Sequence, residues 1–469
     1  MPYGGMGMEI SAWLAQGARA VWGAPLILFI SAFGIMMTLR LRCLQIRALP
    51  RALRLLFAPP DGAKGAVSAF GALSTSLAAM IGTGNIVGVA TAVAAGGPGA
   101  VFWMLVAAFF GMITSYAEGL LAVKYRRVGA DGRVLGGAFL YIERGMGRKF
   151  RPLARLFAVC GALAALLGIG TMAQVNGITG AFCDLFDPRG AWTLTLGSVT
   201  LSGGALAVAV VVTLVTGLII CGGIERIAKA STVVVPVMGA LYVLGTLGVL
   251  IACAPRLPGA LGAIVRGAFS PDAALGGAAG TMAASAIRMG VSRGIFSNEA
   301  GLGSSSIAAA AAKTQSPVEQ GLCTMTGTFI DTIVLCTMTG LAIVVTGAHE
   351  SGLSGVALTN LAYNRGLSML PGMGKLIVST ALMLFATASI LGWNYYGEQC
   401  VEYLAGRRMI PLYRAAYLAA VFFGAFFAVD TVWNLADILN GLMAFPNLLA
   451  LYALSGVVLR ESRRYFSSK

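Results

Sequence analysis

Charged residues are scarce in this sequence. Lys, Arg, Asp and Glu together make up 11% of its 469 residues, whereas about a quarter is usual in a soluble domain. Hydrophobic residues make up 58%. A chain of this length has too few charged residues to form a water-exposed surface. The composition therefore excludes a soluble enzyme, a disordered protein and a small disulfide scaffold. It indicates an integral membrane protein with many helical spans.

Histidine is almost absent as well, since His349 is the only one. This excludes a multi-histidine metal site and a histidine proton relay. The eight cysteines are scattered without a CxxC pair, so we interpret them as free thiols rather than as a metal or redox site. The first residues contain Glu9 and Arg19 but no basic cluster, so we expect no signal peptide and a first apolar run that is retained.

Apolar runs long enough to cross a bilayer, which takes about 20 residues, recur along the chain. We therefore predict an all-α integral membrane protein with about eleven transmembrane helices and no separate soluble domain. The stretch 257–269 is predicted to be a short helix on the membrane surface. The predicted spans are 22–39, 66–95, 100–123, 153–182, 204–223, 231–254, 273–312, 321–347, 374–398, 412–429 and 433–459.

The basic residues are distributed unevenly between the two predicted faces. Of the 33 Lys and Arg, 25 fall in or at the edges of the connections after odd-numbered spans and in the C-terminal tail, only six fall on the other face, and Arg288 and Arg293 lie within span 273–312. Positive charge accumulates on the cytoplasmic side. We therefore expect the cytoplasmic (inner) membrane as the location, with the N-terminus outside and the C-terminus in the cytoplasm. The net charge of +15 is then an orientation signal, and no nucleic-acid partner is expected.

Two of the predicted spans are interrupted. Span 66–95 has Gly82, Gly84 and Asn85 near its middle, where open backbone survives only if it lines a cavity enclosed by protein. The alternative to a broken helix is that these glycines only allow close packing of one helix against another. Span 273–312 is interrupted by charged and glycine residues at 288–294 and again at 296–304. As one straight helix it would be about 60 Å long, twice the thickness of the bilayer core.

These interrupted spans are the second and the seventh, so they enter the membrane from opposite sides. Spans two to six and seven to eleven would then be inverted repeats that each begin with a broken helix. Such a pair is the best sequence pointer to the binding site of a transporter. The predicted division is an N-terminal helix and basic loop (1–65), the first repeat (66–254), the second repeat (255–459) and a cytoplasmic tail (460–469).

Several motifs resemble those of a known family. The run 82–88, GTGNIVG, is similar to the first broken helix of the leucine-transporter fold. Stretches GGAFLYIE (136–143, followed by Gly145), FSNEAGLGS (296–304), GTFIDT (327–332), ILGWNYYGE (390–398) and DILNGLM (437–443) resemble the alanine-or-glycine:cation symporter family. The resemblance extends from about residue 66 to 459. The chain departs from the family pattern at Ala138, Ser306 and Ala309, near the predicted inner gate.

The resemblance implies a leucine-transporter-like core of five plus five helices with one extra N-terminal helix. It also implies secondary active symport of a small neutral amino acid, such as alanine or glycine, driven by Na⁺ and with no other cofactor. Four alternatives stay open: coupling to H⁺, a different small neutral amino acid, a channel or transport-like receptor, and an intramembrane enzyme that uses buried carboxylates. No catalytic motif favours the enzyme. The sequence does not indicate an oligomeric state.

The candidate substrate-binding residues lie at the breaks and on the spans that face them. Open N–H groups around Thr83, Gly84 and Asn85 suit the carboxylate of an amino acid, and open carbonyls suit its ammonium group. Polar side chains at mid-depth of span four and one tryptophan of span nine are candidate pocket walls. The remaining candidates are Gln174, Asn176, Met289 and Trp393.

A Na⁺ site needs oxygen ligands. Hydroxyls of Thr387 and Ser389 in span nine are candidates, although such hydroxyls often bond to their own helix. By resemblance, carbonyls of Ala78 and Ile81 would complete that site. A second oxygen-rich place lies around Asn85 and Asp331, where the carboxylate can either hold Na⁺ or titrate.

Three more carboxylates lie in predicted spans, where each needs a partner or water. By resemblance, Glu118 braces the open backbone of the broken helices. Glu299 is predicted to pair with Arg293 or with an arginine from a loop near the inner gate. For Asp437, near the outer end of the last span, solvation and a gating role are equally consistent with the sequence.

Overall fold

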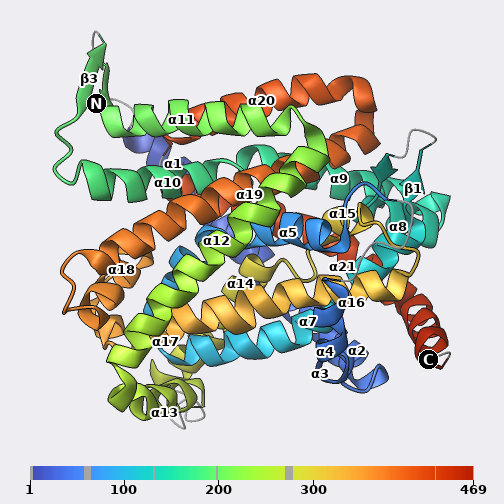
Figure 1. The fold of residues 1–469 in the computed structure, drawn as a ribbon, viewed down its shortest axis with the longest axis horizontal. Helices are drawn as coiled ribbons and strands as arrows, with labels where there is room; N and C mark the ends of the chain where they lie inside the picture. The colour runs from blue at the N-terminus through green and yellow to red at the C-terminus, as the bar shows by residue number, and fades with distance from the viewer. Residues whose placement is uncertain are drawn as a thin grey trace.

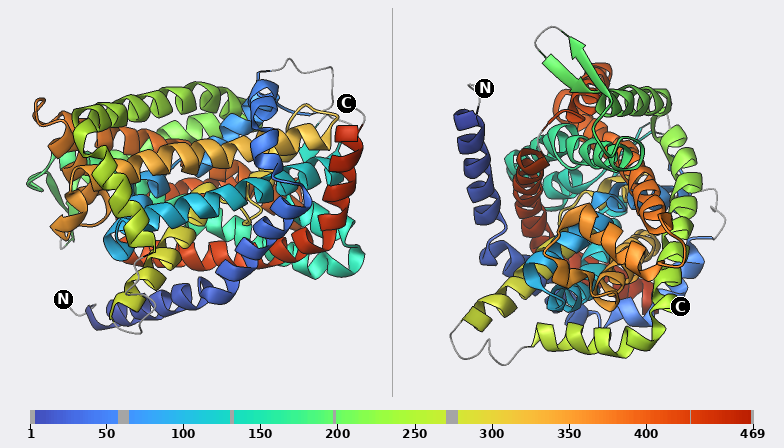
Figure 2. Two further views of the ribbon diagram at one scale, coloured as in Figure 1. Left: turned by 90° about the horizontal axis from the view of Figure 1, so that it is seen from below. Right: turned by 90° about the vertical axis from the view of Figure 1, so that its left-hand side faces the viewer.

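The computed structural model describes residues 4–57, 65–129, 133–196, 199–269, 278–427 and 429–467. These residues form one bundle of helices with two small β-hairpins (Figure 1). The two ends of the chain lie at opposite ends of the bundle (Figure 2). The bundle end near the C-terminus carries the β1–β2 hairpin and most of the basic connections; we call it the basic face.

The first part of the chain contributes the N-terminal helices and the first broken span. Its helices are α1 (Gly4–Val21), α2 (Ala24–Arg40), α3 (Leu44–Arg47), α4 (Leu49–Leu55), α5 (Ala69–Met80), the π-helical turn η1 (Gly84–Gly88), α6 (Val89–Gly96), α7 (Gly99–Tyr125), α8 (Ala138–Gly145), α9 (Arg151–Leu167), α10 (Met172–Phe186), α11 (Gly203–Ile220) and α12 (Gly223–Ala252). The antiparallel hairpins are β1 (Arg127–Val128) with β2 (Val134–Leu135), and β3 (Thr193–Leu196) with β4 (Val199–Ser202).

The second part begins with the short helix that we predicted at the membrane surface. Its helices are α13 (Leu257–Ala268), α14 (Ala278–Asn298), α15 (Ser305–Ala310), α16 (Pro317–Thr328), the π-helical segment η5 (Phe329–Cys336), α17 (Thr337–Val345), α18 (Gly355–Gly366), α19 (Met373–Ala405), α20 (Ile410–Gly424) and α21 (Val429–Ser467).

Within the described residues, eight helices are long and apolar enough to cross a membrane, or nine if the bent pair α5 and η1–α6 is one span. Two predicted spans fall outside this set. The segment 273–312 contains charged residues and is broken, and α20 has 15 residues. The multi-pass membrane architecture is therefore confirmed, while the count of eleven and the division into two repeats stay predictions.

The first broken span bends where its glycines predict. Helix α5 ends at Met80, Ile81 adopts an extended conformation (φ −78°, ψ 93°), and helical backbone resumes at Gly84. The two halves meet at an angle of 52°. Carbonyls at the end of α5 and N–H groups at the start of η1 are left without their usual partners, so this bend provides open polar backbone inside the bundle.

The second broken span differs from the prediction in one respect. Helix α14 continues through 288–294, so the interruption predicted there is wrong. Gly290 instead permits close packing, because a Cβ there would lie 2.9 Å from Trp103 Cβ of α7. The real break follows Asn298. Glu299 has a left-handed backbone (φ 56°), as do Gly301 and Gly303, and helix resumes at Ser305.

The ends of the two broken spans meet at the basic face. Val67 and Ala312 form a parallel bridge, with Ala66 N donating to Ala311 O (2.8 Å) and Lys313 N donating to Val67 O (2.7 Å). Arg126, just after α7, donates to the carbonyls of Ala310 (2.7 Å) and Ala312 (2.6 Å). Burial lowers the pKa of this guanidinium from its usual value. These contacts close the basic face between the two broken spans.

Candidate functional site

The first break is joined to the second half of the chain by Asn85. The backbone N–H of Gly82 donates to Asn85 Oδ1 (3.0 Å), so the side chain caps the open turn. Its Nδ2 donates to Asp331 Oδ1 in η5 (2.7 Å). Both side chains are fully buried. The pair therefore connects two segments that are 246 residues apart in the sequence.

Asp331 collects hydrogen bonds from three elements. Besides Asn85, Ser297 Oγ of α14 donates to its Oδ2 (2.8 Å), and so does the hydroxyl of Thr332 (2.7 Å). Among the described residues no Lys or Arg forms an ion pair with it. A buried carboxylate without a cation needs hydrogen bonds and a counter-charge. Three donors supply the hydrogen bonds, which leaves the negative charge available for a bound cation.

Of the other predicted cation ligands, Ser389, Ile81 and Ala78 lie at the first break, whereas Thr387 does not. Ser389 Oγ of α19 donates to Ile81 O (3.2 Å), the carbonyl at the end of α5. Ala78, in the last turn of α5, is fully buried beside it. Thr387 is not brought to the break, because its hydroxyl donates to Met383 O in its own helix (2.7 Å). The structure therefore places Ser389, but not Thr387, beside the open carbonyls.

The two polar candidate residues of predicted span four, Gln174 and Asn176, have different neighbours in the structure. Gln174 Oε1 accepts a hydrogen bond from Thr83 N at the break (3.2 Å), and its Nε2 donates to Ile169 O (3.0 Å). Asn176 instead donates to Phe427 O (2.9 Å) and is half-buried. Because one turn of helix takes about 3.6 residues, side chains two positions apart point to different sides of the helix and face different neighbours. Only Gln174 reaches the break.

Small residues bring the walls of the break together. A Cβ on Gly84 would lie 3.4 Å from Ser297 Cα, so the two broken spans are in contact there. On α19, Gly392 allows close approach to Ala79, and Trp393 is fully buried, with no partner for its indole N–H among the described residues. The hydroxyl of Thr83 is buried as well, and it too lacks a partner within the described part of the chain. The break is therefore closely packed and contains two buried polar groups that could donate to a ligand.

Glu118 lies against the second break. Its Oε1 accepts from the backbone N–H groups of Gly301 (3.1 Å) and Gly303 (3.0 Å), and from Asn447 Nδ2 (2.7 Å). Its Oε2 accepts from Ser305 Oγ (3.2 Å). This position agrees with the one implied by the family resemblance, although its role in transport stays a prediction.

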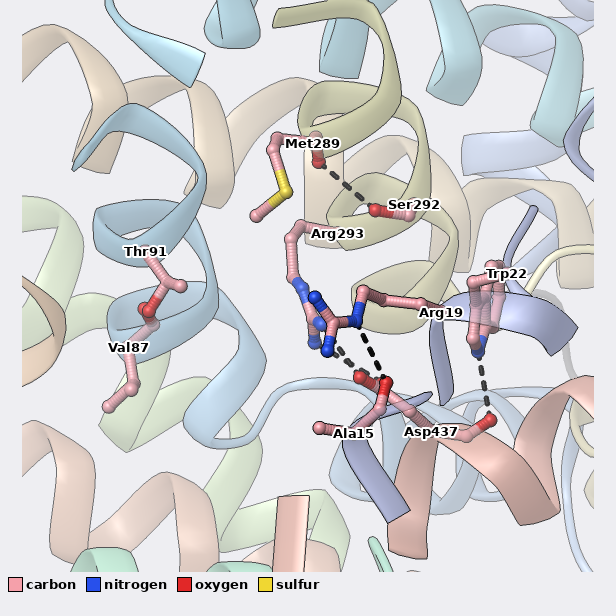
Figure 3. A network of polar contacts seen from close by, with 9 residues as sticks. All are labelled: Ala15, Arg19, Trp22, Val87, Thr91, Met289, Ser292, Arg293 and Asp437. Carbon is pink, nitrogen blue, oxygen red and sulfur yellow. Dashed lines mark hydrogen bonds and ion pairs between the residues drawn. The ribbon is translucent and has the colours of Figure 1, made fainter. Parts of the chain in front are cut away.

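The predicted partner of Glu299 is wrong. Among the described residues Glu299 forms no ion pair; Ser304 Oγ donates to its Oε2 (2.5 Å). Arg293 pairs instead with Asp437 of α21, with Nη2 to Oδ2 at 2.7 Å and Nη1 to Oδ1 at 3.3 Å (Figure 3). Residues 293 and 299 are six apart, and α14 ends between them, so their side chains lead to different surroundings.

Met289, the last substrate candidate, lies one turn before Arg293 on α14. Its side chain is half-buried and points toward the side of η1 and α6 that carries Val87 and Thr91 (Figure 3). It is therefore on the approach to the break from the face opposite the basic face, rather than at the Asn85–Asp331 pair.

Three residues of the site are not among the predicted site residues. Ser297 and Thr332, the donors to Asp331, lie inside motifs that the sequence analysis identifies, so a signal for them was present. Asn447, which donates to Glu118, is an isolated amide in the last apolar run and gives no such signal.

Comparison with known proteins agrees with this arrangement. The model of the sodium:alanine symporter family matches residues 8–469. The chain is 45% identical over 455 residues to the sodium/alanine symporter AgcS of Methanococcus maripaludis, covering 95% of each chain. It is 38% identical to the probable sodium/glutamine symporter GlnT of Bacillus subtilis, covering 96% of this chain and 89% of that protein.

A solved structure shows the same fold. The crystal structure of MhsT in complex with L-phenylalanine superposes with a TM-score of 0.59, covering 84% of this chain and 90% of that one at 13% identity. This likeness confirms the predicted leucine-transporter-like fold.

Proposed function

The chain belongs to the sodium:alanine symporter family, and from that membership we propose that it carries a small neutral amino acid, alanine or glycine, into the cell together with Na⁺. One observation supports this most directly. The first break is joined through Asn85 to the buried carboxylate of Asp331 in η5, and Ser297, at the end of α14 just before the second break, donates to the same carboxylate. Paired broken helices of this kind form the substrate and ion sites of secondary transporters.

A small substrate is consistent with the close packing around the break. A Cβ on Gly84 would already be in van der Waals contact with Ser297, so the two broken spans lie close together there. At the bend, side chains rather than helical backbone pair with the N–H groups of Gly82 and Thr83 and with the carbonyl of Ile81. The carboxylate and the ammonium group of an amino acid would take the place of such side-chain contacts. Trp393 limits the space from the α19 side. These features favour alanine or glycine over glutamine, the substrate in the name of one relative.

Two places support a cation. One is formed by Asn85 and Asp331, where the carboxylate provides a full negative charge. The other is formed by Ser389 with the carbonyls of Ile81 and Ala78, which cannot release a proton at physiological pH and therefore favour Na⁺. Proton coupling through Asp331 is the competing form of this proposal.

Alternating access would use the contacts that close each end of the site. The basic face is closed by the Val67–Ala312 bridge, while Arg293 and Asp437 join α14 to α21 on the other side. A cavity of about 690 Å³ opens at the basic face beside Gly65 and Ala66, the first described residues of the broken span, and reaches Glu398 and Arg414. We assign this cavity to the release path.

Uptake into proteoliposomes tests the function. With labelled alanine, an inward Na⁺ gradient at constant pH should produce transient accumulation, and an imposed pH gradient without Na⁺ should not. Accumulation that follows only the pH gradient would reject Na⁺ coupling. Equilibration without accumulation under either gradient would indicate a channel.

The cation site beneath the first break can be tested with a matched pair of hydroxyl residues. Ser389→Ala should raise the Na⁺ concentration for half-maximal alanine uptake roughly tenfold, equivalent to about 1.4 kcal/mol, because one oxygen beside Ile81 is lost. Thr387→Ala, two residues away on the same helix, should leave it unchanged because that hydroxyl bonds to its own helix. Equal effects of the two substitutions would place the Na⁺ site elsewhere.

A further inference from the structure

The N-terminal helix pair contacts the ion pair that joins the second broken span to the last helix. Helix α1 packs along the first part of α21 (Figure 2), and Trp22 stands at the junction of α1 and α2. Its indole N–H donates to the backbone carbonyl of Asp437 at 2.8 Å (Figure 3). The Trp22 side chain is 5% exposed, so this hydrogen bond is shielded from competing water.

The contact depends on missing side chains on both helices. Gly441 lies one turn after Asp437, and a Cβ there would overlap Val21 and lie 3.5 Å from Trp22 Nε1. On the opposite helix, a Cβ on Gly17 would lie 3.1 Å from Ile438 Cδ1. Glycines on both helices therefore let the backbones approach closely enough for the indole to reach a carbonyl inside α21.

The carboxylate of the same residue holds α14. Arg293 approaches Asp437 with two nitrogens, and the side chains of the pair are only 18% and 9% exposed. The guanidinium carbon also lies 5.3 Å from the ring of Phe296, which packs against Trp433 of α21 with ring centroids 5.4 Å apart. Asp437 therefore accepts a hydrogen bond from Trp22, at the junction of α1 and α2, through its backbone carbonyl, and it pairs with Arg293 of α14 through its carboxylate.

We propose that Trp22 is a positioning residue for closure of the site on the side opposite the basic face. Helices α1 and α2 precede both predicted repeats, so they can hold α21 in place from outside the two repeats that would move during transport. Trp22 fixes the turn of α21 that carries Asp437, and this fixed carboxylate is what Arg293 meets when α14 and α21 come together. Loss of the indole hydrogen bond loosens the closure without touching substrate or cation. The inference rests on the proposed function, since closure of this kind belongs to a transporter.

The test measures how accessible the approach to the break is. Met289→Cys places a thiol beside the ion pair, and its reaction with a membrane-impermeant reagent is followed by mass spectrometry of the peptide that contains it. Trp22→Phe in this background should raise the reaction rate about three- to tenfold, the range expected from one net hydrogen bond. Trp13→Phe in α1, where the side chain is 76% exposed, should not change it.

A double-mutant cycle separates positioning from general loosening. Asp437→Asn weakens the ion pair and should raise the labelling rate at least as much as Trp22→Phe. If Trp22 acts through Asp437, Trp22→Phe should add little to the rate of the Asp437→Asn protein. An unchanged rate in Trp22→Phe alone, or effects of the two substitutions that multiply fully, would overturn the proposal. Labelling needs neither Na⁺ nor amino acid, so failure of the uptake experiment would leave this result interpretable.

Discussion

Asp331→Asn should abolish Na⁺-driven alanine uptake while leaving the protein folded. Asn has nearly the same shape as Asp, and its hydrogen bonds can be rearranged. The amide oxygen can still accept from Asn85, and the amide nitrogen can donate to the hydroxyls of Ser297 and Thr332, which accept as well as donate. The substitution therefore removes the negative charge with little other change to the cluster.

The expected loss is large because the charge is buried. A unit charge about 4 Å from Na⁺ contributes about 4 kcal/mol at an effective dielectric constant near 20, so the apparent Na⁺ affinity should fall by roughly a hundredfold or more. By reciprocity, the factor by which Na⁺ raises the alanine affinity equals the factor by which alanine raises the Na⁺ affinity, in the wild type and in Asp331→Asn alike. Calorimetric titration with Na⁺ at several fixed alanine concentrations measures both the Na⁺ affinity and this factor. Normal Na⁺-driven uptake in Asp331→Asn would make Asp331 a structural residue.

The second large effect concerns Glu118 and stability. Glu118→Leu removes the acceptor for the backbone N–H groups of Gly301 and Gly303, and for Asn447 and Ser305, all of which are buried. The two backbone N–H groups cannot turn to another acceptor, and each of them costs about 1–3 kcal/mol when it is left without one. We therefore expect the free energy of unfolding to fall by roughly 2–6 kcal/mol, measured as a lower thermal midpoint in detergent.

Glu118→Gln provides the matched control. Its amide oxygen can take the place of Oε1, and its amide nitrogen can donate to the hydroxyl of Ser305. It should retain most of the stability that Glu118→Leu loses. If Gln and Leu destabilise equally, the negative charge rather than the hydrogen bonds holds the second break in place.

The sequence predicts local features of this fold better than tertiary contacts. Apolar length predicts the membrane helices, and the glycines at 82 and 84 predict the first bend, because both depend on residues close in sequence. Glycines at 290 and 294 resemble those of a break but pack against α7. Composition cannot distinguish these cases, since the difference lies in the neighbouring helix.

Pairing between distant segments was the least predictable part of the site. Arg293 has a carboxylate six residues away, yet it pairs with Asp437, 144 residues away. Thr387 and Ser389 look equivalent in sequence, and only the packing of α19 against α5 separates them. The family resemblance compensates partly, since it implies that Glu118 lies against the open backbone of the broken helices.

The distance along the chain between Asn85 and Asp331 has a consequence for biosynthesis. Ribosomes add about 5–20 residues per second, so the first broken helix waits on the order of tens of seconds for the residues that complete it. During that time its open backbone lies in a half-made bundle without the 2.7 Å bond from Asn85 to Asp331. Lipid offers no hydrogen bonds to such groups. We therefore expect the newly inserted first half to depend on water or on the insertion machinery until the second half arrives, and the two predicted repeats to mature together rather than independently.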